Sequence, residues 1–387
     1  MNIGLDYRPA LRPNSRRRGV GRYTHQLTRA LLELHTEHPF VLYGLRDAPI
    51  DLAGPFRTQP VFHLRKPTRL NWLTDSLILP RRIRSDGLDV FHATDPLVAP
   101  TCRECRVVVS IHDLIPYIFW KETCARVPAD FRFALKRAWR RWRNADLVVT
   151  HSEHSKQDIC RMLSMPESKV HVVPPGCTLE PAHSGKERAA AVRTKYGICG
   201  DFLLYVGGTD YRKNLSRMLE AFRGIRRQGY AGQLVMVGET FMWNIPEVLE
   251  LKHRAEELAI SESVRYLGFV PDEELSILYA TCDFFFFPSL YEGFGLPVLE
   301  AMQCGAPLLI SRSSSIPEVA GEAAFYFDPE QVETMIEAFN QAIRNPDLVD
   351  RKRKEALSLA RQFTWKSAAE RMMALYEASR EGRQKES

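Results

Sequence analysis

The feature that most constrains the fold is a regular alternation of short apolar, β-rich runs with helical patterns. A helical pattern from Gly21 to Leu34 separates the first two of these runs. Such alternation predicts a parallel sheet covered by helices. The runs of the first half are Asn2–Asp6, Phe40–Gly44, Asp89–His92, Val107–Ile111 and Leu147–Thr150.

The alternation stops at residues 170–185, which contain three prolines and two glycines, and then starts again. We interpret this segment as a strand followed by a linker. The chain therefore has the pattern of an α/β protein with two Rossmann-like, doubly wound domains, at 1–173 and 174–364. The second half has predicted strands at Phe202–Val206, Leu234–Val237, Val264–Phe269, Phe284–Phe287 and Leu308–Ile310, and predicted helices at Asn214–Arg227, Pro246–Ala259, Asp272–Ala280 and Pro297–Gln303.

Length and composition agree with two soluble domains. A chain of 387 residues is too long for one ordinary core. Its hydrophobic share of 45% and charged share of 26% are typical of globular proteins. No apolar run approaches the ~18 residues of a membrane span, and no signal peptide is recognisable. We therefore expect a cytoplasmic protein.

The eight cysteines are scattered, and a single C-x-x-C joins Cys102 to Cys105. Since no second pair stands at a zinc-ligand spacing, free thiols are the favoured interpretation. Metal or redox function at this pair is the alternative.

The net charge of +6 is concentrated in basic clusters of the first half. Each cluster is either a solvated face or a site for phosphorylated ligands or an anionic membrane. In the segment 132–143, an amphipathic helix would present a basic stripe to lipid, although such a helix can equally pack on the sheet. Nucleic acid is not expected as a partner, because no aromatic stacking platform accompanies the charge. The clusters are Arg16-Arg17-Arg18, Arg81-Arg82 with Arg84, and the run from Arg132 to Arg143.

A loop with two carboxylates follows the predicted strand of four phenylalanines. Glu292 lies in the loop, and Glu300 is expected in the first turn of a helix that has Pro297 at its first position. In open α/β sheets, ligands bind beyond the carboxyl ends of the strands, where N–H groups of a helix start attract phosphate. The carboxylates can accept hydrogen bonds from vicinal sugar hydroxyls. The alternative is that Glu300 only complements the helix dipole and Glu292 only faces water.

Two cations follow the first strand of the second half. Gly207-Gly208 ends that strand, and Arg212 and Lys213 precede Asn214, a predicted N-cap. Arg binds phosphate oxygens bidentately and Lys adds a point charge, so the pair predicts a diphosphate clamp. A solvated surface pair is the alternative.

Two features of the first half point to the same kind of edge. Gly19-Val20-Gly21 opens the first helical pattern, where a backbone can approach phosphate or sugar closely. His112-Asp113 follows the strand VVVSI, so His112 is a candidate for binding or proton transfer. Either feature alone is weak.

Taken together, four stretches resemble the family 4 retaining glycosyltransferases of GT-B architecture. The most specific part is the pattern of two glutamates separated by seven residues inside EGFGLPVLE. The resemblance implies two Rossmann-like domains that face across a cleft, with a final helix at about 365–380 that crosses back to the first. The stretches are SLYEGFGLPVLEAMQCGAP, YVGGTDYRKNLSRMLEAF, GVGRYTHQLTRALL and SIHDLIPY.

The resemblance also implies roles for single residues. Glu300 is expected on the ribose, Glu292 at the donor-sugar hydroxyls, and His112 beside the transferred sugar. Arg212 and Lys213 would hold the diphosphate. The implied catalytic residues are Glu292, His112, Arg212 and Lys213, and the implied donor-binding residues are Gly21, Gly207, Arg212, Lys213, Val270, Glu292, Gly293, Phe294, Gly295, Leu296 and Glu300.

One departure concerns Gly208, where many relatives of this kind have an arginine. A subgroup resembling bacterial mannosyl- and surface-polysaccharide transferases shares the Gly-Gly form, so GDP-mannose is the expected donor. The expected reaction moves a hexose to a hydroxyl of a glycan or lipid-linked acceptor. The sequence has no D-x-D motif, and we expect neither a metal nor a cofactor. The alternatives are a nucleotide-sugar epimerase of the same architecture and a non-catalytic nucleotide-sugar-binding module.

Overall fold

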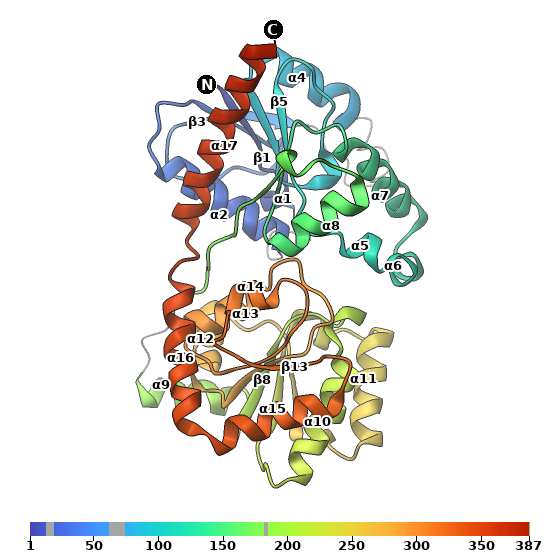
Figure 1. The fold of residues 1–387 in the computed structure, drawn as a ribbon, viewed down its shortest axis with the longest axis vertical. Helices are drawn as coiled ribbons and strands as arrows, with labels where there is room; N and C mark the ends of the chain where they lie inside the picture. The colour runs from blue at the N-terminus through green and yellow to red at the C-terminus, as the bar shows by residue number, and fades with distance from the viewer. Residues whose placement is uncertain (13–18, 62–73, 182–184, 387) are drawn as a thin grey trace. The chain divides into compact units, whose positions relative to one another are not determined.

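The computed structural model describes residues 1–12, 19–61, 74–181 and 185–386. The chain divides into two compact units, 1–176 with 363–387, and 177–362 (Figure 1). The sequence placed the boundaries at 173 and 364, a few residues from these positions. The predicted basic cluster Arg16-Arg17-Arg18 lies outside the described residues.

The first unit is built on a seven-stranded parallel sheet in the order β3-β2-β1-β4-β5-β6-β7. Its inner strands are buried on both faces, which explains why they read as continuous apolar runs. The strands are β1 (Ile3–Asp6), β2 (Phe40–Leu45), β3 (Phe56–Val61), β4 (Val90–Ala93), β5 (Arg106–Ser110), β6 (Leu147–Thr150) and β7 (Val170–Val172).

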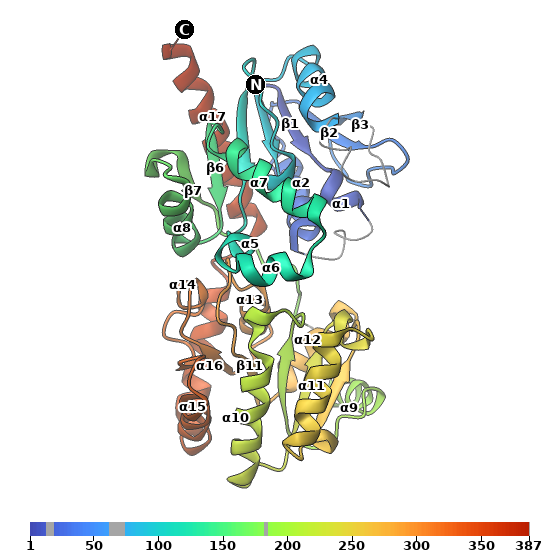
Figure 2. The ribbon, with the colours of Figure 1, turned by 90° about the vertical axis from the view of Figure 1, so that its right-hand side faces the viewer.

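Helices cover both faces of this sheet (Figure 2). Side chains of α2 and α17 share one apolar cluster with the sheet, and side chains of α4, α7 and α8 share another on the opposite face. The helices of the unit are α1 (Arg8–Leu11), α2 (Gly19–Glu33), α4 (Leu79–Ser85), α5 (Ile115–Ile118), α6 (Trp120–Arg126), α7 (Ala129–Trp142), α8 (Glu153–Leu163) and α17 (Trp365–Glu386).

The C-terminal helix α17 belongs to the first unit although the second unit precedes it in sequence. It packs along α2, and Trp365, Ala369, Met372 and Tyr376 are buried in the shared cluster. The periodicity had indicated an apolar face without showing what it covers. The expected return of the final helix to the first domain is confirmed.

The second unit has a six-stranded parallel sheet in the order β10-β9-β8-β11-β12-β13. Its strands are β8 (Phe202–Val206), β9 (Gln233–Val237), β10 (Val264–Leu267), β11 (Phe284–Phe287), β12 (Leu308–Ser311) and β13 (Phe325–Phe327). Its helices are α9 (Lys186–Lys195), α10 (Leu215–Arg227), α11 (Pro246–Glu257), α12 (Asp272–Thr281), α13 (Leu296–Gln303), α14 (Ile316–Ala320), α15 (Val332–Arg344) and α16 (Pro346–Ala360).

The four phenylalanines form the central strand β11, buried on both faces as predicted. Phe286 packs edge-on against Phe327, and Phe287 stacks on Tyr205. This aromatic packing fixes the strand whose carboxyl end carries the loop with Glu292. The predicted α/β fold with two doubly wound sheets is confirmed.

Several local predictions differ from the structure, and among the helices α4, α8, α9, α15 and α16 were not predicted. Two edge strands, β3 and β13, were missed because β3 is largely exposed and contains Pro60, and β13 has only three residues. The short helix α1 was missed directly after β1. The predicted strand to Phe269 ends at Leu267, and the Phe269 side chain is exposed. Within the described ranges, every helix is too short or too polar to span a bilayer.

Candidate active site

The predicted donor-binding residues of the second unit gather at the carboxyl edge of its sheet. β8 and β11 are adjacent parallel strands, so the loops that follow them leave the sheet side by side. The loop after β8 carries Arg212 and Lys213 in a short 3-10 turn, and the loop after β11 carries Glu292. Residues 79 and 80 positions apart in sequence are thereby brought into contact.

Glu292 accepts hydrogen bonds from both predicted cations. Lys213 Nζ lies 2.6 Å from Oε1 of Glu292, and Arg212 Nη1 lies 2.5 Å from Oε2. The Nε of Arg212 lies 3.0 Å from Oδ1 of Asp210, which adds a second carboxylate. The side chains of Lys213 and Glu292 are less than a tenth exposed. We name this group, Asp210, Arg212, Lys213 and Glu292, the charge cluster.

Burial and neighbouring charge act against each other in the charge cluster. Burial opposes ionisation of Glu292, but the attraction of Arg212 and Lys213 outweighs it and lowers the pKa of Glu292 to about 2. Burial and the nearby Arg212 lower the pKa of Lys213, against the attraction of Glu292. Glu292 is therefore ionised at neutral pH and partly neutralises the two cations.

Backbone and serine contacts fix the loop between β11 and α13. Leu290 N donates to Arg212 O at 2.7 Å, and Arg212 Nη1 donates to Tyr291 O at 3.1 Å. Glu292 N donates to Ser314 Oγ at 2.8 Å, and Ser315 Oγ donates to Glu292 O at 2.9 Å. These serines were not predicted, although the stretch SRSSS, which begins at the last residue of β12, is a usable signal. These hydrogen bonds thus hold in place the loop that carries Glu292 of the charge cluster.

The helix after this loop begins slightly differently from the prediction. Gly295 has φ 101°, a left-handed conformation that favours glycine, and Leu296 is the first helical residue. Pro297 is therefore second, and Glu300 begins the second turn rather than lying in the first. Gly295, the N-cap residue of α13, has no side chain that could cap the helix. The prediction of a helix N-terminus at the carboxyl edge holds in these corrected positions.

The structure places Glu300 with Tyr279 of α12, whose hydroxyl lies 3.3 Å from Oε2. Val270 is buried in the loop between β10 and α12. Asn214 occupies the N-cap position of α10, as predicted, but its side chain makes no capping hydrogen bond. Its own φ is 58°, and its amide nitrogen donates to Pro288 O and Pro329 O.

The glycine turn after β8 requires close backbone approach at one residue and leaves space at the next. A Cβ on Gly207 would lie 2.6 Å from the hydroxyl of Tyr205, which donates to Gly208 O at 2.7 Å. A Cβ on Gly208 would meet no heavy atom within 4 Å. The position at which the resemblance implies an arginine in many relatives therefore has space for a side chain.

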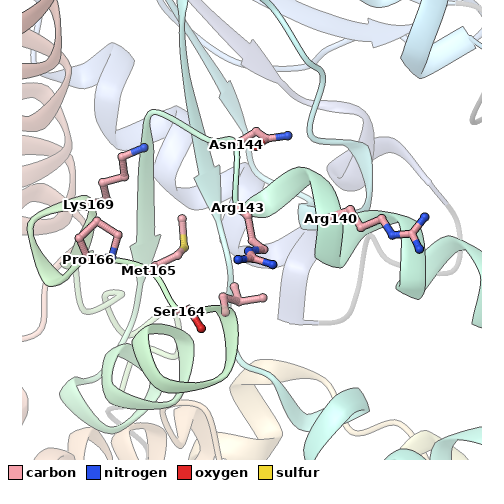
Figure 3. Close-up of a pocket in the computed structure, with 8 residues that line it drawn as sticks. Arg140, Arg143, Asn144, Ser164, Met165, Pro166 and Lys169 are labelled. Carbon is pink, nitrogen blue, oxygen red and sulfur yellow. The ribbon is translucent and has the colours of Figure 1, made fainter.

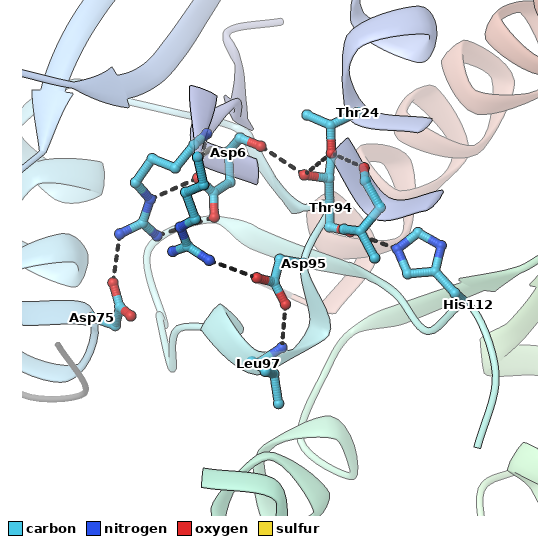
Figure 4. A network of polar contacts seen from close by, with 10 residues as sticks. Asp6, Thr24, Asp75, Thr94, Asp95, Leu97 and His112 are labelled. Carbon is cyan, nitrogen blue, oxygen red and sulfur yellow. Dashed lines mark hydrogen bonds and ion pairs between the residues drawn. The ribbon is translucent and has the colours of Figure 1, made fainter. Parts of the chain in front are cut away.

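The remaining predicted residues, Gly21 and His112, belong to the first unit. Gly21 is buried as the third residue of α2. His112 Nε2 lies 2.9 Å from Thr94 O at the carboxyl end of β4 (Figure 4). Thr94 is held in turn, since its hydroxyl donates to Asp6 O at 2.6 Å and lies 3.0 Å from that of Thr24.

An ion-pair network supports this edge of the first sheet (Figure 4). Arg8 is fully buried and bonds to Asp6 at 2.7 Å and to Asp75 at 2.6 Å. Arg12 Nη1 lies 3.0 Å from Oδ2 of Asp95, whose other oxygen accepts from the backbone N of Leu97. None of these residues was predicted to have a role. Since a buried ion pair is stable only when its partners stay in place, the network fixes the loop next to His112.

A cavity of 360 Å³ in the first unit lies at the opposite, amino edge of the sheet, with Arg140, Arg143 and Lys169 in its lining (Figure 3). The guanidinium groups of Arg140 and Arg143 point away from each other there. Arg143 follows α7, and Lys169 Nζ lies 3.4 Å from Ala145 O. Cations at helix C-termini complement the helix dipole, so this cavity needs no ligand to explain its charge.

All eight cysteines are free thiols. Among the described residues, no group of three or more His, Cys, Asp and Glu side chains is placed to hold a metal ion.

Comparison with known proteins gives the family. Residues 199–359 match the family described as glycosyl transferases group 1, and residues 17–180 match glycosyltransferase family 4. O-antigen chain mannosyltransferase B of Escherichia coli is 29% identical over 70% of this chain and 70% of its own. The serotype-specific mannosyltransferase WbdA of Escherichia coli is 29% identical over 68% of this chain, and the match spans only 32% of WbdA.

A solved structure agrees with this match at the level of the fold. Anabaena Alr3699/HepE in complex with UDP-glucose superposes with a TM-score of 0.72 at 16% identity, over 97% of this chain and 99% of that one. Together, the two family matches span most of the described chain. The chain belongs to the glycosyltransferases of GT-B architecture, with a family 4 match in its first half and a group 1 match in its second.

Proposed function

We propose that this chain is a retaining glycosyltransferase that moves a hexose from a nucleoside-diphosphate sugar to an acceptor hydroxyl. The observation that carries the proposal is the charge cluster: Arg212 and Lys213 meet Glu292 beside the start of α13. Two cations and helix N–H groups suit a diphosphate, and a carboxylate suits sugar hydroxyls.

The donor exchanges contacts within the charge cluster. In the ligand-free protein, Glu292 accepts hydrogen bonds from both cations, Arg212 and Lys213. A diphosphate carries more negative charge than one carboxylate, so it competes for Arg212 and Lys213 and releases Glu292 to the sugar hydroxyls. Glu292 thereby holds the two cationic side chains in place before the donor arrives.

The chemistry is then electrostatic. The bond between the anomeric carbon and the diphosphate oxygen breaks, its electrons go to the leaving phosphate, and Arg212 and Lys213 stabilise that charge. The acceptor oxygen attacks the oxocarbenium-like sugar from the same face, and its proton passes to the leaving phosphate oxygen. One preorganised donor of this kind contributes ~3–4 kcal/mol in a transition state. Metal independence is part of the proposal, since the protein's own cations supply the positive charge.

We propose GDP-mannose as the donor and a glycan or lipid-linked acceptor in bacterial surface-polysaccharide synthesis. Support comes from the relatives named as O-antigen and serotype-specific mannosyltransferases. Because HepE was solved with UDP-glucose, a UDP-sugar is the competing candidate for the donor. A thermal-shift series with GDP, UDP, GDP-mannose and UDP-glucose separates them, since a ligand at 100 times its Kd adds ~2.7 kcal/mol to stability.

A lipid-linked acceptor would bring the protein, a cytoplasmic one in this proposal, to the inner face of the plasma membrane. Helix α7 supports peripheral contact: Leu135, Ala138 and Trp142 are buried, whereas Lys136 and Arg140 are exposed. Phe133 on the same helix is 56% exposed. Sedimentation with anionic liposomes at low salt tests this part, and a protein that stays in the supernatant contradicts it.

The activity itself is tested by incubating the protein with GDP-mannose and mannose-terminated acceptors and following products by NMR. A new glycosidic bond with the donor's anomeric configuration supports the proposal. An altered donor without any acceptor indicates an epimerase. Tight nucleotide binding without turnover on any acceptor indicates a binding module.

A further inference from the structure

A second histidine, His151, lies against His112. His112 follows β5 and His151 follows β6, and these neighbouring parallel strands bring the two rings together. Nδ1 of His112 lies 2.7 Å from Nε2 of His151, with ring centroids 5.0 Å apart. The other nitrogens face backbone carbonyls: His112 Nε2 is 2.9 Å from Thr94 O, and His151 Nδ1 is 3.1 Å from Val173 O.

When both rings are neutral, the pair has one proton fewer than its three hydrogen bonds require. A carbonyl oxygen only accepts, so His112 Nε2 and His151 Nδ1 must each carry a proton. The contact between the two rings needs a third proton, on one nitrogen or the other. Two neutral imidazoles carry two protons, so the full set of hydrogen bonds exists only when the pair has one positive charge.

Burial and the neighbouring negative charges have opposite effects on the protonation of the pair. Burial lowers the pKa of His112, and burial with the nearby His112 lowers the pKa of His151 to about 3. Negative charge from Asp113 and Asp95 favours a protonated His112. The other titratable groups are His92 of β4, Tyr23 of α2, whose ring contacts both histidines, and Tyr376 of α17, which bonds to His92.

We propose that His112 and His151 gain and lose a single shared proton as one unit, so that His151 sets both the orientation and the charge of His112. In the neutral state one of the three hydrogen bonds is missing, and in the singly protonated state all three form. His151 is thus a positioning residue that acts through His112. The consequence of the shared proton for catalysis rests on the proposed function, in which His112 lies beside the donor sugar. There, the positive charge of the protonated pair favours binding of the diphosphate.

The test uses the ligand-free protein, so it does not depend on the proposed function. Imidazole ¹⁵N shifts of His112 are followed by NMR from pH 8 down to the lowest pH at which the protein stays folded, in wild type and in His151→Gln. A glutamine amide can still donate to His112 Nδ1 but cannot share a proton. We expect the midpoint of the His112 titration to move by at least one pH unit in His151→Gln, and the exposed His253→Gln to leave it unchanged.

Identical His112 titrations in wild type and His151→Gln overturn the proposal. If His151→Gln does not fold, His112→Gln allows the reciprocal measurement on His151, and an unchanged His151 titration has the same meaning. In active enzyme, the corresponding inflection in the pH profile of kcat/KM should shift by a similar amount in His151→Gln. If wild-type protein binds no nucleoside diphosphate, the proposed function fails while the NMR result stands.

Discussion

Lys213 Nζ and Oε1 of Glu292 lie 2.6 Å apart, both side chains less than a tenth exposed, although 79 residues separate them in sequence. The contact shows that the cation predicted for the diphosphate and the carboxylate predicted for the sugar share one location. It also shows that each is the other's partner before any ligand arrives. The first two predictions follow from this pair.

Replacing Lys213 with alanine should lower kcat/KM between a hundredfold and a thousandfold. The reason is the loss of one preorganised cation at the leaving phosphate, which is worth ~3–4 kcal/mol. Steady-state kinetics with the best donor measure the loss, and thermal unfolding checks that the variant is folded. Arg188→Ala is the matched control, because Arg188 is half-exposed in its ion pair with Glu273. A loss below tenfold for Lys213→Ala argues against the clamp.

The depressed pKa of Glu292 predicts a loss of stability in acid. Its pKa is about 2 in the folded protein and ordinarily 4.5, so the stabilisation is complete above pH 4.5 and is lost as pH falls towards 2. Ionised Glu292 contributes about 3 kcal/mol to the free energy of unfolding, and about 2 kcal/mol of this should be lost between pH 7 and pH 3. Urea unfolding at both pH values measures it.

In Glu292→Gln this part of the acid loss should be absent, because the amide does not titrate. Glu273→Gln serves as control, since its carboxylate is 79% exposed. Equal losses of free energy of unfolding in wild type and Glu292→Gln would show that the pair does not depress the pKa. Activity of Glu292→Gln should also fall, since the amide accepts fewer hydrogen bonds from the donor sugar.

The open space at Gly208 predicts that an arginine can be installed there. Because a Cβ on Gly208 meets no heavy atom within 4 Å, Gly208→Arg should fold normally. A charge-assisted bond to phosphate is worth ~1.5–3 kcal/mol, so the affinity for nucleoside diphosphate should rise about tenfold or more. Isothermal titration with GDP and UDP measures it, and Gly208→Gln is the uncharged control. Unchanged affinity in the arginine variant would place the diphosphate away from this turn.

The C-terminal helix should stabilise the first unit through one buried polar contact. The hydroxyl of Tyr376 lies 2.6 Å from Nδ1 of His92, and both side chains are fully buried. Tyr376→Phe leaves that nitrogen without its partner and should cost ~1–3 kcal/mol of the free energy of unfolding. Denaturant unfolding measures the cost, with the exposed Lys366→Ala as control. No change in stability would mean that water replaces the lost hydroxyl.

Much of the fold was readable from the sequence because its signals are local. Apolar runs such as Phe284–Phe287 predict inner strands of a parallel sheet whatever surrounds them, and this prediction is confirmed. The strands that were missed, β3 and β13, lie at sheet edges, where exposure or shortness removes the signal. The missing capping bond at Asn214 has a different cause: its amide bonds to carbonyls 74 and 115 residues away.

The sequence by itself determined the class of fold and the family, and it predicted the residue types of the candidate site, since periodicity, turn chemistry and the spacing of Glu292 and Glu300 are properties of short segments. Only the tertiary structure decided the partners: Glu292 with Lys213, His112 with His151, and α17 with α2. Strand order decides the first two contacts, because it determines which loops meet at a sheet edge, and helix packing decides the third. A short segment of sequence does not specify the order of the strands in the sheet.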